Sequence, residues 1–196
     1  MLSGMTYEID MRLRPNGDSG LLATPLNSYE NYLKKEAWTW EHQALVRGRF
    51  ITGDADTQVT YEAIRQRILC LPRNELELKQ EVYKMREKMR NTLDNSNQQT
   101  FNLKQGIGGI ADIEFIVQFC ILAYSEKHPD LMQFTDNINL LNTLAEQQLL
   151  NQEYVTTLKQ AYCIFRDWGH KETLQGNKAL IAQDQLVEIR KQVANI

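Results

Sequence analysis

The 196-residue sequence has few of the residues that mark several large classes of protein. It contains only 4 Pro and 10 Gly, which leaves little room for the many turns of an all-β fold. Its 3 cysteines lie far apart and include no CxxC pair, which argues against a zinc site or a disulfide framework. We expect all three cysteines to be core thiols in a reducing cytoplasm.

Basic residues and long apolar runs are also missing. The chain has 22 Lys and Arg against 25 Asp and Glu, a formal net charge of −3, which argues against non-specific nucleic-acid binding. The most apolar stretch, residues 115–124, is far shorter than the roughly 20 residues that cross a bilayer. The N-terminus lacks the basic segment and apolar core of a signal peptide. We therefore expect a cytoplasmic protein with neither nucleic-acid nor membrane partners.

Apolar residues make up 42% of the chain, and most of it has helical periodicity. The spacing predicts helices over residues 27–36, 38–47, 54–71, 74–93, 111–126, 136–149, 151–173 and 183–195. Polar residues at 94–100 and glycines at 106–109 interrupt the helices. We expect apolar side chains to pack the bundle, including Trp38, Trp40, Val59, Leu76 and Tyr83. The predicted fold is mainly α, with residues 54–196 as a helical domain.

The first residues follow a different pattern, because residues 6–14 alternate between apolar and charged side chains. This predicts a β-strand with one buried and one charged face, ended by turn residues at 15–20. A lone strand is not stable. We therefore expect it to be the last strand of a sheet, and the chain to be a fragment of a larger protein.

The charged face of this strand is the first candidate site, since it places Asp10 between Glu8 and Arg12, with Arg14 beyond. One interpretation is a solvated face with cross-strand ion pairs, each of small energy. The alternative is a site in which a carboxylate holds Mg²⁺ and arginines neutralise a triphosphate.

A second candidate is the segment from Lys104 to Phe115, which carries Gly106, Gly108 and Gly109. Glycines let the backbone approach a ligand, and amides at a helix start attract anions. The segment is not a Walker loop, however, so a glycine-capped helix start is the alternative. Elsewhere, His42 has no visible nucleophile partner, and we expect it at the rim of the helices.

Three segments together resemble the glutamine synthetase adenylyltransferase family. They are the strand and turn at residues 7–22, the Ala-Trp-Thr-Trp-Glu-His-Gln-Ala-Leu-Val-Arg segment at 37–47, and the Lys-Gln-Gly-Ile-Gly-Gly-Ile-Ala-Asp-Ile-Glu-Phe segment at 104–115. The likeness is closer to the C-terminal, adenylylating half of that bifunctional family. It implies an Mg²⁺-dependent transfer of AMP from ATP to a tyrosine of glutamine synthetase, controlled by the PII signal protein and glutamine.

The resemblance also implies roles for single residues. Asp10 takes the place of a metal-binding, catalytic carboxylate in a sheet like that of DNA polymerase β. The candidates for nucleotide binding are Arg12, Arg14, Lys104, Asp112 and Glu114. Since the chain supplies neither the Gly-Ser pair nor the Asp-x-Asp of that site, residues 1–53 are expected to be a remnant of the transferase domain, inactive in isolation. Two alternatives stay open: a helical module that docks glutamine synthetase or PII, and the related PII uridylyltransferase.

Overall fold

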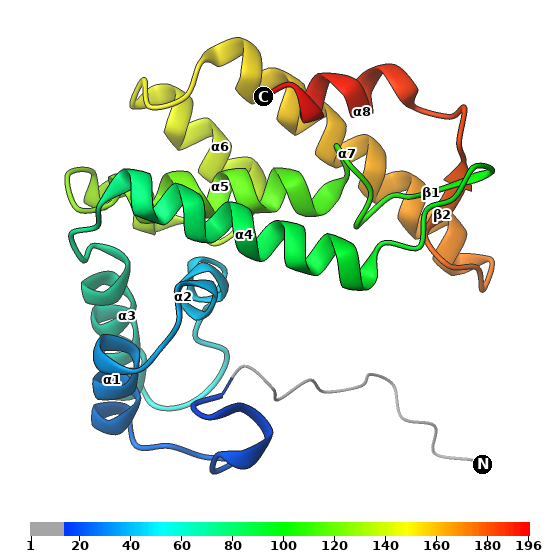
Figure 1. The fold of residues 1–196 in the computed structure, drawn as a ribbon. Coiled ribbons are helices and arrows are strands. Elements are labelled where there is room, and N and C mark those ends of the chain that lie inside the picture. Colours follow the sequence, from blue (N-terminus) through cyan, green and yellow to red (C-terminus); the bar gives the residue numbers. More distant parts are fainter. Residues whose placement is uncertain (1–13) are drawn as a thin grey trace.

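The computed structural model describes residues 14–196, which are mainly helical (Figure 1). The α-helices are α1 (Leu26–Lys35), α2 (Thr39–Val46), α3 (Ala55–Leu69), α4 (Glu75–Leu93), α5 (Ile110–Tyr124), α6 (Asn137–Glu146), α7 (Gln152–Leu174) and α8 (Val187–Ala194). Short 3-10 helices lie at η1 (Gly17–Ser19) and η2 (Pro129–Gln133). The mainly α prediction is confirmed. The strand predicted at residues 6–14 lies almost wholly outside the described residues, so its sheet stays a prediction.

Helix α5 is the centre of the bundle. It packs against α2, α4, α6, α7 and α8, while α1 to α3 form the lower part of the molecule in Figure 1. Its apolar sequence explains this position, because a helix that is hydrophobic on most sides is stable only when neighbours surround it. Helix α2 packs on both α4 and α5, across the boundary that the sequence predicts at residue 53. That division into domains remains a prediction.

Side-chain caps fix several helix starts near their predicted places. Asp54 accepts a hydrogen bond from the Thr57 amide at the start of α3, and Asn74 accepts two from the first turn of α4. Asp136 caps α6 in the same way. Each side-chain oxygen satisfies an amide that has no partner within the helix. The helix boundaries therefore follow from local chemistry that the sequence displays.

Two arginines, the buried Arg65 and the half-buried Arg73, hold the helix ends together. Arg65 donates to carbonyl groups at the end of α2 and around η2, namely those of Leu45, Val46, Met132 and Phe134. Arg73 donates to carbonyls at the end of α3 and of α5, those of Ile68, Leu69, Leu71 and Leu122. Burial lowers the pKa of both guanidinium groups. These arginines satisfy carbonyls that a helix leaves unpaired at its end.

A small sheet joins two distant parts of the chain. β1 (Thr100–Asn102) pairs antiparallel with β2 (Leu180–Ala182), and Phe101 lies opposite Ile181. The sequence did not predict either strand. Among the described residues, no helix is long and apolar enough to cross a membrane.

Several apolar side chains that were expected to pack are exposed instead. The correction covers Trp38, which is 71% exposed, together with Trp40, Val59, Leu76 and Tyr83. Each of these side chains lies on a part of the surface that no neighbouring element covers, so it has little to pack against. The cysteine prediction is also wrong in part: Cys120 is buried, Cys70 is half-buried and Cys163 is exposed.

Candidate functional site

The predicted metal and phosphate residues of the first strand are only partly within the structure. Asp10 and Arg12 lie outside the described residues, so their roles stay predictions. Arg14 begins the turn that the sequence predicts at residues 15–20, and its Nε donates to the Gly20 carbonyl at 3.3 Å. The turn itself is confirmed, because η1 occupies its centre.

One Asp-x-Asp sequence does occur, at Asp54-Ala55-Asp56, but it starts a helix. The Asp54 carboxylate accepts bonds from the amide and hydroxyl of Thr57, at 2.7 and 2.8 Å, and these bonds lower its pKa. A carboxylate used in this way is a helix cap. Across residues 14–196, moreover, no group of three His, Cys, Asp or Glu is placed to hold a metal ion. The Mg²⁺ site that the resemblance implies at Asp10 stays a prediction.

The glycine segment before α5 is shaped by packing. Gly108 has a φ of +76°, and a Cβ there would lie 2.0 Å from the carbonyl oxygen of Arg190, which precludes any other residue. A Cβ at Gly106 would likewise lie 2.2 Å from the ring of Phe101. The glycines thus let the segment pass against β1 and α8. Lys104 remains exposed on this segment.

Asp112, in the first turn of α5, is the centre of a charged network. Its Oδ1 accepts from Arg86 Nε at 2.5 Å and from Arg90 Nη2 at 2.7 Å, while its Oδ2 accepts from the Gly108 amide at 2.7 Å. Arg86 also donates to the side chain and carbonyl of Gln105. One carboxylate thus fixes two arginines of α4 and closes the glycine segment onto α5. We call these residues (Arg86, Arg90, Gln105, Gly108 and Asp112) the Asp112 network.

Glu114 makes a simpler contact on another side of α5. Its Oε1 accepts from Arg47 at 2.6 Å, just after the end of α2. One turn further along, Gln118 accepts a bond from Gln43 of α2 at 3.0 Å. Because α2 and α4 flank α5, Glu114 holds Arg47 at the end of α2, whereas Asp112 holds two arginines of α4. The structure therefore places Asp112 and Glu114 on the same helix turn but in separate contacts.

His42 lies inside the helix contacts and not at their rim. Its Nε2 lies 2.8 Å from the Leu33 carbonyl and must donate, because a carbonyl only accepts. Its Nδ1 then accepts from Arg73 at 3.3 Å. Burial is the main cause that lowers the His42 pKa. A neutral histidine that joins α1, α2 and the end of α3 explains this residue without a catalytic role.

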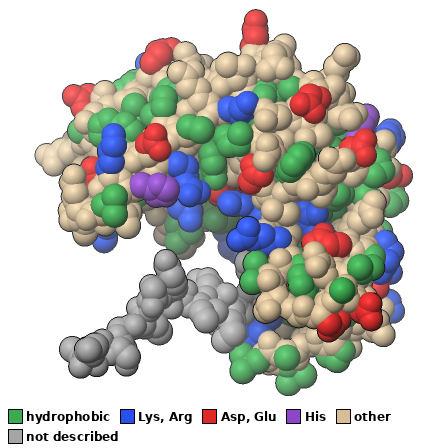
Figure 2. Space-filling view, turned by 180° about the vertical axis from the view of Figure 1, so that it is seen from behind, with side chains coloured by type: hydrophobic (Ala, Val, Ile, Leu, Met, Phe, Trp, Pro, Cys, Tyr) green, Lys and Arg blue, Asp and Glu red, His purple; other side chains and the backbone are tan. Residues whose placement is uncertain are grey.

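Two exposed basic residues, Lys104 and Arg47, lie beside the first turn of α5. Figure 2 shows several Lys and Arg side chains on the lower edge of the larger, upper part of the molecule, near its junction with the smaller part. The sequence interpretation named Lys104 but missed Arg47, Arg86 and Arg90. A signal for two of them is present, since Met-Arg occurs at 85–86 and again at 89–90, one helical turn apart.

Comparisons with known proteins find two family models and two similar enzymes of one name. Residues 1–64 match the family model described as glutamate-ammonia ligase adenylyltransferase, and residues 76–180 match that of the GlnD PII-uridylyltransferase. A bifunctional glutamine synthetase adenylyltransferase/adenylyl-removing enzyme from Nitrosococcus oceani is 47% identical over 188 residues, 96% of this chain. A protein of the same name from Methylococcus capsulatus is 45% identical over 94% of the chain. The chain spans about a fifth of the length of these two relatives.

Proposed function

Since the chain belongs to the glutamine synthetase adenylyltransferase family, we propose that it takes part in the transfer of AMP from ATP to a tyrosine of glutamine synthetase. The observation that carries this proposal is the 47% identity over 96% of the chain. We assign the chain to the adenylylating half of such an enzyme, in the cytoplasm, with PII and glutamine as its regulators. Residues 1–53 belong to the transferase domain in this proposal, and residues 54–196 to the helical domain.

Asp10 is the residue that we propose as catalytic metal ligand. Its carboxylate would supply oxygen atoms to Mg²⁺, the type of ligand that this ion prefers. When bound, Mg²⁺ neutralises charge on the transferred phosphoryl group. A single carboxylate does not complete a two-metal site, and the Asp-x-Asp at residues 54–56 caps a helix. We therefore propose that these 196 residues do not transfer AMP without a further Asp-x-Asp strand.

The geometry divides the other candidate residues into two roles. Asp112 and Glu114 are negative and already hold arginines, so they act as positioning residues in this proposal and do not touch phosphate. Lys104 and Arg47 are exposed cations next to them, and we propose that these two contact the phosphates of ATP. Arg12, in the predicted strand, and Arg14, at the start of the turn, would also contact the phosphates of ATP.

A second candidate function is the docking of a partner protein by the helical domain. The match of residues 76–180 to a PII-uridylyltransferase model favours it. The two families are named for different protein substrates, yet both match parts of this chain. We therefore propose that these helices bind a molecule that both kinds of enzyme recognise. That molecule is either the nucleotide or PII. The two candidates differ in whether the chain's own residues affect the chemical step.

A chimera tests the proposed function. In the Nitrosococcus oceani relative, the matched 188 residues are replaced by this chain, and AMP transfer from α-labelled ATP to glutamine synthetase is measured. We expect transfer by the chimera and none by the 196 residues alone. Lys104→Ala should raise the KM for ATP more than it lowers kcat, because phosphate contacts form before the chemical step.

A control variant shows whether the effect of Lys104→Ala on the KM for ATP is specific to that residue. Lys127→Ala, which changes another lysine of the same domain, should leave the KM for ATP unchanged. Transfer by the isolated 196 residues would refute the need for a further strand. A chimera that is folded and binds PII but does not transfer AMP would favour the docking module over a role in AMP transfer.

A further inference from the structure

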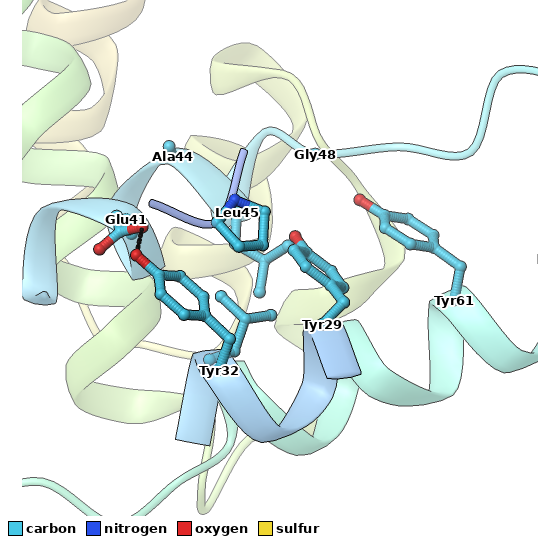
Figure 3. A pocket seen from close by; sticks show the side chains of 9 residues that line it. Tyr29, Tyr32, Glu41, Ala44, Leu45, Gly48 and Tyr61 are labelled. Carbon is cyan, nitrogen blue, oxygen red and sulfur yellow. Dashed lines mark hydrogen bonds between the residues drawn. The ribbon is translucent and has the colours of Figure 1, made fainter. Parts of the chain in front are cut away.

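A small cavity lies among α1, α2 and α3, away from the Asp112 network. Its volume is about 160 Å³, and its walls include Tyr29 and Tyr32 of α1, Glu41 of α2, Tyr61 of α3 and Gly48. We call these five residues the tyrosine pocket (Figure 3). The three tyrosines come from two helices, and Glu41 closes the side beside Tyr32. None of the functional residues proposed above lines this space.

The polar atoms of the pocket are not all used. The Tyr32 hydroxyl donates to Glu41 Oε1 at 2.7 Å, and the Trp38 amide donates to Glu41 Oε2 at 2.9 Å. A carboxylate accepts about four hydrogen bonds, so Glu41 has room for roughly two more. The hydroxyls of Tyr29 and Tyr61 make no hydrogen bond with any side chain or backbone group of residues 14–196. The pocket therefore offers several acceptors to a ligand with hydrogen-bond donors.

The charge on the wall of the pocket is negative only. Glu41 is the one charged residue among the described residues that line it, and no Lys, Arg or His joins it there. Burial raises the pKa of Tyr29 to about 12 and also raises that of Tyr61, so both hydroxyls stay neutral at pH 7. Tyrosine rings attract cations through their faces. A carboxylate ligand would find no cation in the wall, whereas an ammonium group would find one anion and three tyrosines.

Gly48 keeps the cavity open. A Cβ at this position would lie 2.7 Å from the Tyr61 hydroxyl oxygen and 3.2 Å from the Leu45 carbonyl oxygen. The Tyr61 hydroxyl would have to move by a few tenths of an ångström or more to admit a methyl group. Glycine at this position thus leaves the Tyr61 hydroxyl free to face a ligand.

We infer that the tyrosine pocket binds a small organic ammonium ion without a carboxylate group. The ammonium group donates to Glu41 and to the free tyrosine hydroxyls, and its short alkyl part contacts Ala44 and Leu45, which also line the cavity. This inference is independent of AMP transfer, because it rests on residues that have no part in the proposed reaction.

The binding of propylammonium chloride to the full chain, followed by amide chemical shifts in NMR, tests the inference. We expect saturable shifts confined to residues around the pocket, which propanol and potassium chloride at equal concentration do not produce. Glu41→Gln should weaken the affinity at least tenfold, because it replaces a charged hydrogen-bond acceptor of the ammonium group by a neutral one. Gly48→Ala, which displaces Tyr61 and leaves the charge unchanged, should weaken binding as well.

Tyr83→Leu is the matched control, since Tyr83 is an exposed tyrosine of α4 outside the pocket. It should bind propylammonium as the unchanged chain does. Glu41 also caps α2, so the circular dichroism of each variant is measured first, and Gly48→Ala carries the test if Glu41→Gln unfolds. Equal shifts with propanol, or full affinity in a folded Gly48→Ala variant, would overturn the inference.

Discussion

Removal of the Asp112 carboxylate gives a sharp test of how the structure is held together. Asp112 and Arg86 are nearly buried, with side chains 14% and 6% exposed, and they lie 2.5 Å apart. Asp112→Ala takes a partner from Arg86, Arg90 and the Gly108 amide at once. Breaking a buried ion pair costs about 3–5 kcal/mol. Arg86 keeps its bonds to Gln105, so we expect a loss of about 3–4 kcal/mol, in the lower part of that range.

Glu114→Ala is the control, because it removes another carboxylate from the same turn of α5. Its partner Arg47 is 40% exposed, and an exposed pair contributes only about 0–1 kcal/mol. Unfolding in urea, followed by circular dichroism, measures both variants. We expect a lower midpoint and an unchanged slope for Asp112→Ala, and a melting temperature lower by roughly 6 to 16 °C. Equal losses in the two variants would refute the view that the Asp112 network stabilises the bundle.

Three further predictions concern the core, the thiols and the pH dependence of stability. Phe165→Ala should cost about 3–5 kcal/mol because the ring is fully buried, whereas Leu174→Ala, on the same helix but 88% exposed, should cost little in the same urea experiment. Cys163 should react with a thiol reagent in the folded chain, whereas Cys120, whose pKa burial raises to about 12, should react only after unfolding. Burial lowers the His42 pKa below 6.5 in the folded chain, so the unfolded chain takes up the proton more readily. The free energy of unfolding should therefore fall as the pH drops below 6.5, and His42→Gln should flatten that dependence.

The helices could be predicted because their signals are local. The apolar spacing, the caps at Asp54 and Asn74 and the glycines before α5 all lie within a few residues of the boundaries they set. The strands could not be predicted in this way. β1 and β2 have three residues each and lie almost 80 residues apart, so their pairing depends on how α7 returns the chain.

The environments of single side chains were harder to predict than the helices. Trp38 is apolar enough for a core, yet at the start of α2 most of its side chain is exposed. Arg65 is charged, yet it is buried because four carbonyl groups surround it. Sequence spacing identifies which residues share a helix face, but not which face another helix covers. The same limit applies to the candidate site, where Asp112 and Glu114 were predicted without the arginines that hold them.

The most direct measurement is the rate of AMP transfer to glutamine synthetase by the chimera with Asp10→Asn, next to the unchanged chimera. If this chain supplies a catalytic carboxylate, Asp10→Asn abolishes transfer. The folded chimera should still bind glutamine synthetase and PII. Asp130→Asn, which changes an aspartate of the 3-10 helix η2, should leave the rate unchanged. An Asp10→Asn chimera that transfers AMP at the unchanged rate would contradict the proposed role of this residue and favour the docking module.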